Sequence, residues 1–315
     1  MRIKNLIAPL VGILLLVILF YNFDFKSIAV VFSQVNIYPS IIALLLVILS
    51  TIICSLRWNN ILEQKGIKYK IIDLIRLNFE SITIISIVPA GLAGVEAWRL
   101  TALYNINKNE FKTSAPTIII DRLSGMWGLS IISLSGLLIL QFSKGFFFIN
   151  NYITYFYFLL LLSFVLIPIL NRLLIFVLSK IKYYSDFFHY VIRILNVSFF
   201  YKIFFYSVLN QFLLMVSFWL CSIAVGVNLS FLTVMSLGLV IMLPSIIPFS
   251  FLGYGPREIG VVFLLSFYFI PKEEALVISL IYGFLTTSQG LLGLPFFYQR
   301  IKLLLQNKFL NKFRN

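Results

Sequence analysis

Charged residues are scarce in this chain of 315 residues. They make up 11% of it, whereas about a quarter of the residues of a soluble domain are charged. Apolar residues account for 61%, and the mean hydropathy is +1.01. This composition excludes a soluble globular protein and indicates a polytopic membrane protein. The net charge of +14 therefore does not predict nucleic-acid binding, because no soluble basic domain is present to carry it.

Histidine and cysteine are equally rare. His189 is the single histidine, and Cys54 and Cys221 both lie in apolar runs, where a thiol behaves as a small hydrophobic group. We therefore expect no disulfide, no metal site and no cofactor. The metalloprotease, serine-hydrolase and nucleotide-binding motifs HExxH, GxSxG and Walker A are also missing. These absences favour a transport-type protein over an enzyme, driven downhill or by an ion gradient rather than by ATP.

Long apolar runs are what the chain has instead. Six of them reach the length of about 17 residues that a helix needs to cross the hydrocarbon core. Two further apolar segments are interrupted by prolines and glycines; we predict a half-depth hairpin for the first and either a deep hairpin or two short spans for the second. The fold class is thus all-α, with six full spans and two broken segments. The spans are 6–22, 37–56, 115–141, 154–171, 203–226 and 275–298, and the broken segments are 81–104 and 231–270.

The basic residues give the orientation. If each broken segment returns to the side it left, nearly all loop arginines and lysines, Arg57 included, fall on the cytoplasmic side together with both termini. Only Lys26, Lys144 and Lys272 then lie outside. This arrangement agrees with the positive-inside rule. A complete crossing at 81–104 would move the basic loop 172–202 to the outside, so the returning hairpin is preferred.

The order of the segments repeats within this single membrane domain. Residues 1–141 and 142–315 each contain two spans, a broken segment and a further span. Three crossings per half would make the halves inverted repeats, in which discontinuous helices meet near the middle of the bilayer. We expect Gly94–Arg99 and Gly253–Glu258 to enter from opposite sides and to face one cavity.

The second broken segment carries the most unusual charges. Pro256 suits the first turn of a helix, and Glu258 suits its positive end. Arg257 is opposed by the helix dipole and needs an anion. That anion is either a protein carboxylate, Glu96 or Asp121, or the phosphate of a lipid, which a guanidinium grips with two hydrogen bonds.

Charges in the first half have both structural and functional interpretations. Glu96 and Arg99 are three residues apart, so they share a helix face and either pair with each other or contact a substrate. Arg122 near the cytoplasmic end of its span is placed to reach lipid phosphates. Asp121 is a partner for Arg99 or Arg257, or a protonatable group for ion coupling.

Three motifs carry a family resemblance. GYGPRE at 253–258, VPAGLAGVEAWRLTALY at 88–104 and IIIDRLSGMWGL at 118–129 are similar to motifs of the flippase-like membrane family that includes the transmembrane regions of lysylphosphatidylglycerol synthases. The resemblance implies a multi-pass protein of the bacterial cytoplasmic membrane that corresponds to the transport half, without the soluble aminoacyl-transferase domain. It implies that arginines hold the lipid phosphate, carboxylates balance their charge and glycines admit the head group. The candidate substrate-binding residues are Gly94, Glu96, Arg99, Asp121, Arg122, Gly253, Gly255, Arg257 and Glu258.

The expected function is movement of an anionic lipid, a glycerophospholipid or a polyprenyl-phosphate-linked sugar, between leaflets. One alternative is a membrane-embedded transferase that acts on a lipid-linked sugar or aminoacyl donor, with Asp121, Glu96 or Glu258 as general base. The other is a scaffold that recruits a cytoplasmic lipid-modifying enzyme through its basic loops. The partners are accordingly anionic membrane lipids or lipid-linked sugars, with no nucleic acid.

Overall fold

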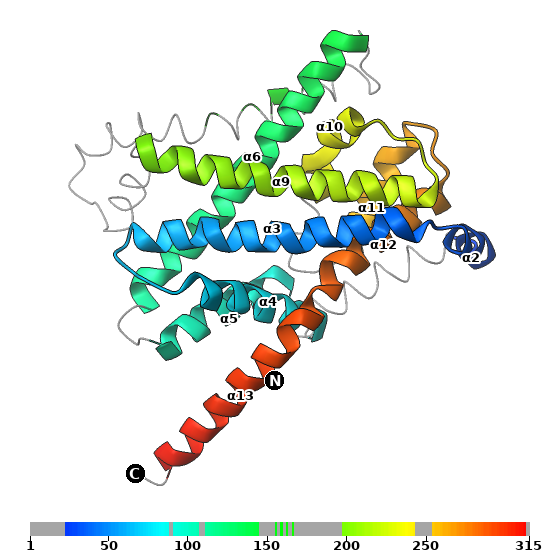
Figure 1. The fold of residues 1–315 in the computed structure, drawn as a ribbon. Helices are drawn as coiled ribbons and strands as arrows, with labels where there is room; N and C mark the ends of the chain where they lie inside the picture. The colour runs from blue at the N-terminus through cyan, green and yellow to red at the C-terminus, as the bar shows by residue number, and fades with distance from the viewer. Residues whose placement is uncertain are drawn as a thin grey trace, which may run out of the picture.

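The computed structural model describes residues 23–87, 91–106, 111–144, 197–242 and 254–312, with five further positions between 155 and 166. These ranges are almost entirely helical (Figure 1). The helices are α2 (Phe25–Ser33), α3 (Ile37–Glu63), α4 (Ile71–Ile87), α5 (Gly91–Ile106), α6 (Phe111–Lys144), α9 (Val197–Val225), α10 (Phe231–Met242), α11 (Pro256–Ser266), α12 (Lys272–Ser288) and α13 (Gly290–Lys312).

Four stretches of helix are long and apolar enough to cross a membrane. They are Ile37–Glu63, Ala115–Leu140, Tyr201–Val225 and Lys272–Leu303, the last running through α12 and most of α13. Four of the six predicted spans are therefore found, and the all-α membrane fold is confirmed. The predicted span 6–22 and nearly all of 154–171 lie outside the described residues.

The first broken segment forms the helix pair α4 and α5, which pack against each other. Asn78 of α4 donates a hydrogen bond to Ser55 Oγ at 2.6 Å, so α4 runs back along α3. Nearer the end of α4, Thr83 Oγ1 bonds the Gly290 carbonyl oxygen at 2.6 Å. Residue 290 lies beside the middle of α3, because Thr51 bonds Gln289 at 2.7 Å. The pair thus reaches about halfway along α3, as predicted for a half-depth hairpin.

The second broken segment contains two short helices, α10 of 12 residues and α11 of 11 residues. At 1.5 Å per residue each is about 17 Å long, roughly half of the hydrocarbon core. The residues between them, 243–253, lie outside the described residues. Gly253 belongs to this gap, so its predicted role stays a prediction.

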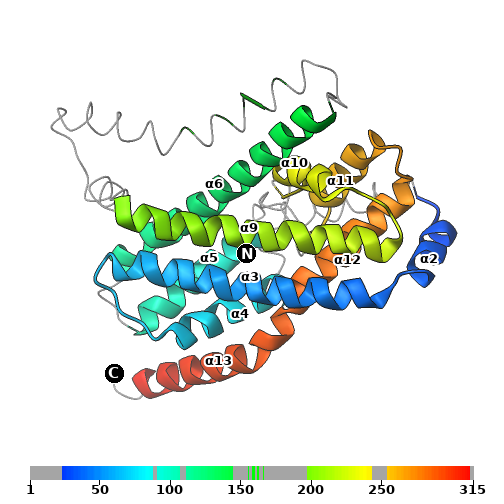
Figure 2. The ribbon, with the colours of Figure 1, turned by 45° about the horizontal axis from the view of Figure 1, so that its top comes forward.

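The two halves of the chain exchange packing partners. α3 packs along the length of α9, as Figures 1 and 2 both show. The short helix α4 of the first half packs against α13 of the second, and the short helix α10 of the second half packs against α6 of the first. Each broken segment is therefore covered by a long helix from the other half.

Glycines allow the closest of these helix contacts. A Cβ added to Gly128 of α6 would lie 2.7 Å from the carbonyl carbon of Ser207 in α9. A Cβ added to Gly136 would lie 2.7 Å from the backbone nitrogen of Ser236 in α10. Small residues let membrane helices approach backbone to backbone, where van der Waals packing replaces the hydrophobic driving force.

We expect Gly128→Ala to separate α6 from α9 and to lower the thermal unfolding midpoint of the purified protein by several degrees. The reason is that the added methyl meets backbone atoms, which move only if a whole helix moves. Leu123→Ala, on an exposed face of the same helix, is the control and should leave the midpoint nearly unchanged. An unchanged midpoint for Gly128→Ala would contradict this packing.

Candidate functional site

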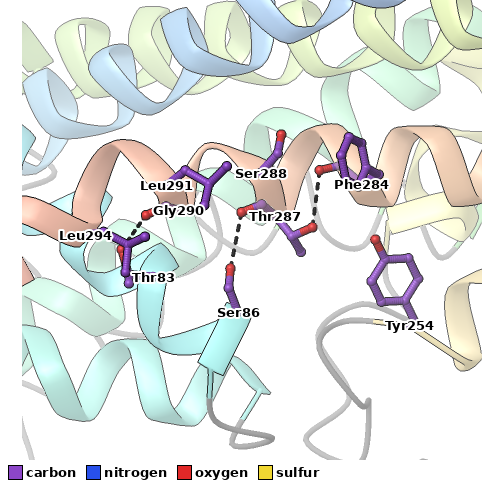
Figure 3. Close-up of a pocket in the computed structure, with 9 residues that line it drawn as sticks. All are labelled: Thr83, Ser86, Tyr254, Phe284, Thr287, Ser288, Gly290, Leu291 and Leu294. Atoms are coloured by element: carbon purple, nitrogen blue, oxygen red, sulfur yellow. Dashed lines mark hydrogen bonds between the residues drawn. The ribbon is translucent and has the colours of Figure 1, made fainter.

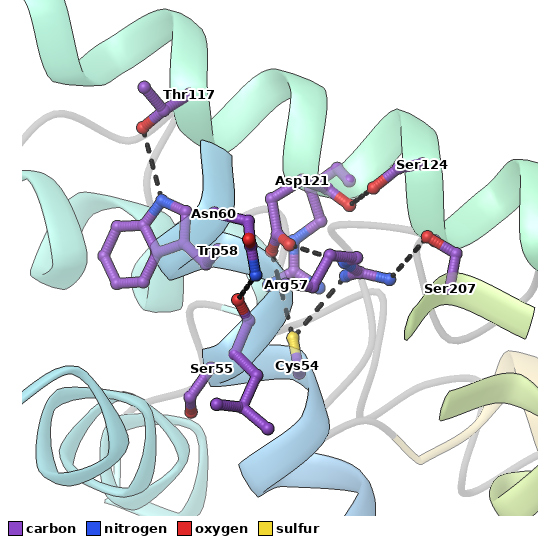
Figure 4. Close-up of polar contacts among 12 residues, drawn as sticks. Cys54, Ser55, Arg57, Trp58, Asn60, Thr117, Asp121, Ser124 and Ser207 are labelled. Carbon is purple, nitrogen blue, oxygen red and sulfur yellow. Dashed lines mark hydrogen bonds and ion pairs between the residues drawn. The ribbon is translucent and has the colours of Figure 1, made fainter. Parts of the chain in front are cut away.

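Asp121 of α6 lies fully buried at the centre of a group of charges from three helices, α3, α5 and α6. Its carboxylate accepts a hydrogen bond from Arg57 Nε of α3 at 2.8 Å and from Arg99 Nη1 of α5 at 3.3 Å. Arg57 and Arg99 are themselves buried. Arg57 also donates to Ser207 Oγ of α9 at 3.4 Å (Figure 4). One carboxylate therefore holds two buried guanidinium groups.

Arg99 is held on several sides. Its guanidinium lies over the ring of Trp58, 4.9 Å from the centroid, and its Nη2 donates to the side-chain oxygen of Asn78. The Trp58 indole nitrogen in turn donates to Thr117 Oγ1 at 3.2 Å (Figure 4). Arg99 Nε is buried and makes no hydrogen bond within the described residues. One donor of a buried cation thus remains available.

Glu96 and Arg122 complete this group, which we call the Asp121 cluster: Arg57, Glu96, Arg99, Asp121 and Arg122. Glu96 forms an ion pair with Arg122 and lies 3.6 Å from Arg99 Nη1. Three arginines face two carboxylates, so the cluster has an excess of one positive charge. The Arg122 side chain is 38% exposed, so a ligand outside the helices can contact the cluster through this residue.

A second group of charges lies where α11 begins. Arg257 Nη2 is 2.6 Å from Glu258 Oε1, and Arg257 Nε is 3.1 Å from the same oxygen. Ser279 Oγ of α12 donates to that oxygen at 3.1 Å. Both charged side chains are buried. The partner of Arg257 is therefore its neighbour Glu258, rather than Glu96 or Asp121.

The start of α11 requires its glycine. Gly255 has a φ of +109°, a conformation that side chains with a Cβ rarely adopt, and Pro256 follows as the first helical residue. The Gly255 N–H donates to Glu258 Oε2 at 2.6 Å. The predicted capping role of Glu258 is thus present in the structure, alongside its ion pair.

Two aromatic rings and a glycine surround the Arg257 guanidinium. The ring centroids of Tyr254 and Tyr282 lie 5.2 and 5.7 Å from its central carbon. A Cβ added to Gly283 of α12 would be 2.6 Å from Tyr254 Cε1 and nearer still to Arg257. Nε and Nη2 are directed at Glu258, and no hydrogen bond reaches Nη1 within the described part of the chain.

The two charge groups lie at different depths. α3 and α12 both begin at the side where α2 lies and run in the same direction (Figures 1 and 2). The Thr51–Gln289 hydrogen bond fixes their register. Arg57 comes after Thr51 in α3, whereas Ser279, which contacts Arg257, comes before Gln289 in α12. At 1.5 Å per residue, the two charge groups are therefore roughly 20 Å apart along the helices. This differs from the expectation that both groups share one cavity.

A pocket of about 370 Å³ does receive side chains from both broken segments. Thr83 and Ser86 come from the end of α4, and Tyr254 comes from the GYGPRE motif at 253–258. The remaining lining residues come from α12 and α13, as Figure 3 shows: Phe284, Thr287, Ser288, Gly290, Leu291 and Leu294. No charged side chain is among the described residues that line it.

The structure places the predicted site residues as follows. Glu96, Arg99, Asp121 and Arg122 come together in the Asp121 cluster, and the predicted pairs of Glu96 with Arg99 and of Asp121 with Arg99 are both present. Gly94 lies inside α5, within one turn of Glu96. Gly255, Arg257 and Glu258 form the second group. Among the described residues no group of three potential ligands is placed to hold a metal.

Sequence reasoning missed three charged residues. Arg57 was assigned to a cytoplasmic loop because its apolar run ends at residue 56, but α3 continues to Glu63 and Arg57 is buried. Glu80 of α4 accepts two hydrogen bonds from Arg300 of α13, at 2.5 and 3.1 Å, and one from Trp98 at 3.2 Å. The available signal was the presence of the carboxylates Asp121 and Glu80 within helical segments, since buried charges need partners.

A comparison with known protein families matches residues 5–293 to the family described as the lysylphosphatidylglycerol synthase TM region. The match covers most of the chain and contains both charge groups and most of the pocket. The comparison with curated proteins finds no match.

Proposed function

We propose that this chain, which belongs to the family of lysylphosphatidylglycerol synthase TM regions, moves an anionic lipid between the two leaflets of a bacterial cytoplasmic membrane. The family and the apolar helices make it a multi-pass membrane protein related to lipid metabolism or transport. The observation that carries the finer proposal is Arg257, a buried cation at a broken helix with Nη1 unbonded within the described residues. Tyr254, which covers it, also lines the pocket.

The geometry suits transient phosphate binding. Glu258 neutralises Arg257 when no lipid is present, which avoids an uncompensated charge inside the bilayer. A phosphate oxygen at Nη1 would then add a charge-assisted hydrogen bond without displacing Glu258. A guanidinium bonded on one edge and open on another is therefore able to take up and release an anion.

The Asp121 cluster supplies a second attraction for an anion. Its excess positive charge and its partly exposed Arg122 lie roughly 20 Å from Arg257. A lipid phosphate would meet one group of arginines at each depth, with the pocket between them. The exchanged packing of short and long helices supports the further proposal that the halves are inverted repeats that rock against each other.

Transport is tested by neutralising Arg257 and Glu258 together. We expect Arg257→Gln with Glu258→Gln to slow the movement of acyl-labelled fluorescent phosphatidylglycerol in proteoliposomes about tenfold or more, because the charge-assisted bond to phosphate is lost. The double change leaves no unpaired buried charge, so the helices keep their packing. The rate is followed as the loss of fluorescence to a reductant that does not cross the membrane.

The matched control is Arg76→Gln with Asp73→Asn, which neutralises an ion pair whose two side chains are each 48% exposed. It should transport like the unmodified protein. If the unmodified protein moves neither phosphatidylglycerol nor a polyprenyl-phosphate sugar faster than empty liposomes, the transport proposal is wrong. Turnover of a labelled lipid-linked donor by the same preparation would favour the transferase alternative instead.

A further inference from the structure

Four hydroxyl groups that line the pocket already donate hydrogen bonds to backbone carbonyl oxygens. Thr83 donates to the Gly290 carbonyl oxygen at 2.6 Å, and Ser86 to that of Thr287 at 3.2 Å (Figure 3). Thr287 donates to the Gly283 carbonyl oxygen at 2.9 Å, and Ser288 to that of Leu285 at 3.0 Å. A hydroxyl that donates keeps lone pairs on its oxygen. Ser86, Thr287 and Ser288 therefore offer hydrogen-bond acceptors to a ligand, whereas Thr83 is almost completely buried.

Acceptors select the chemistry of the occupant. A phosphate or carboxylate brings only acceptors of its own, so it finds no complementary donor at these side chains and only the Tyr254 hydroxyl among the other described lining residues. An ammonium group would find acceptors but no carboxylate among the described lining residues, and a buried cation without an anion is costly. A hydroxyl group both donates and accepts, so an uncharged polyol matches the pocket best.

The rim of the pocket indicates that this polyol belongs to a lipid. Phe284, Leu291 and Leu294 line the pocket and are also exposed on the surface of an apolar span. Side chains of this kind suit acyl or polyprenyl chains rather than water. Tyr254 both lines the pocket and contacts the Arg257 guanidinium through its ring, and its hydroxyl points toward α12 in Figure 3.

We propose that the pocket binds the uncharged, hydroxyl-bearing part of a lipid head group while the lipid phosphate lies beside Arg257. This deepens the proposed function and rests on it. The substrate class is a phospholipid or polyprenyl phosphate that carries a glycerol or sugar. A lipid whose head group is phosphate alone would contact Arg257 and leave the pocket empty.

The inference is tested by binding, separately from transport. Purified full-length protein in phosphatidylcholine nanodiscs is loaded with acyl-labelled fluorescent phosphatidylglycerol and challenged with unlabelled competitors of matched acyl chains. Phosphatidylglycerol presents phosphate and glycerol, phosphatidic acid presents phosphate alone, and phosphatidylethanolamine presents phosphate with an ammonium. We expect phosphatidylglycerol to compete at about threefold to tenfold lower concentration than the other two, the worth of one or two net hydrogen bonds.

Adjacent threonines provide the variant and its control. Thr286 and Thr287 both donate to the Gly283 carbonyl oxygen at 2.9 Å, but only Thr287 lines the pocket. Thr287→Val keeps the shape of the side chain and removes one acceptor. We expect it to reduce the preference for phosphatidylglycerol over phosphatidic acid about threefold, whereas Thr286→Val leaves the preference unchanged.

The remaining arm separates the two sources of polyol. A polyprenyl phosphoglucose is added as a further competitor, both to the unmodified protein and to the Thr287→Val variant. The lipid that loses affinity in the variant is the one whose hydroxyls enter the pocket. Equal competition by phosphatidic acid and phosphatidylglycerol, or equal effects of the two threonine variants, would overturn the inference. A head-group preference without transport would support head-group binding in the pocket and contradict the proposed transport function. Transport without a head-group preference would support the transport function and contradict head-group binding in the pocket.

Discussion

Asp121→Asn is expected to lower the free energy of unfolding by about 3–5 kcal/mol, the usual cost of removing one partner of a buried ion pair. The carboxylate is fully buried and holds both Arg57 and Arg99. Its amide replacement leaves Arg99 with Glu96 at 3.6 Å, and it leaves Arg57 without a carboxylate partner among the described residues. The expected result is a large loss of folded protein at unchanged expression temperature.

The loss is measured as the thermal or denaturant unfolding midpoint in detergent. Asp73→Asn is the matched control, because the same chemical change at an ion pair that is 48% exposed on both sides should cost no more than about 1 kcal/mol. Equal stability of the two variants would mean that Asp121 does not hold the cluster together. A partial recovery by Asp121→Asn with Arg57→Gln would identify Arg57 as the cation left unpaired.

Gly293→Ala is expected to force α13 away from α4 and to destroy the shape of the pocket. A Cβ at this position would overlap the backbone carbonyl group of Phe79, and backbone atoms cannot rotate aside as a side chain can. Overpacking of this kind costs about 1–3 kcal/mol or more. Thr83 and Leu294 line the pocket from the two helices concerned, so binding should be lost together with stability.

The effect is read as the unfolding midpoint and as the affinity for labelled phosphatidylglycerol. Leu292→Ala on the same helix removes an exposed side chain and should change neither. A Gly293→Ala protein with unmodified stability and affinity would show that α13 and α4 are not in backbone contact. Gly136→Ala makes the equivalent test for α6 and α10.

The apolar pattern predicted the spans well, because length and hydropathy alone decide whether a helix fits the hydrocarbon core. The predicted runs 37–56 and 203–226 fall within or nearly within α3 and α9. The prolines and glycines of 81–104 correctly indicated a broken segment. The ends of the helices were predicted less accurately than the spans. α3 continues past residue 56, because polar residues such as Arg57 find partners inside the bundle.

Ion-pair partners were predictable only where they are close in sequence. Glu258 lies beside Arg257 and Glu96 lies three residues before Arg99, so local spacing was informative. Arg57 meets Asp121 and Glu80 meets Arg300 only after distant helices have packed. The pocket was likewise invisible in the sequence, since its hydroxyls belong to ordinary serines and threonines that bond back to their own helix.

The near-continuity of α12 and α13 makes the protein sensitive to the thickness of its bilayer. The helical stretch from Lys272 to Leu303 is about 48 Å long, and its uncharged part from Ala275 to Gln299 is about 37 Å long, whereas a hydrocarbon core measures about 30 Å. A stretch of this length fits by tilting, by bending where α12 meets α13, or by thickening the lipid around it. Leu291 and Leu294 belong to the same stretch and line the pocket. A thinner membrane that increases the tilt of this stretch therefore also moves one wall of the pocket.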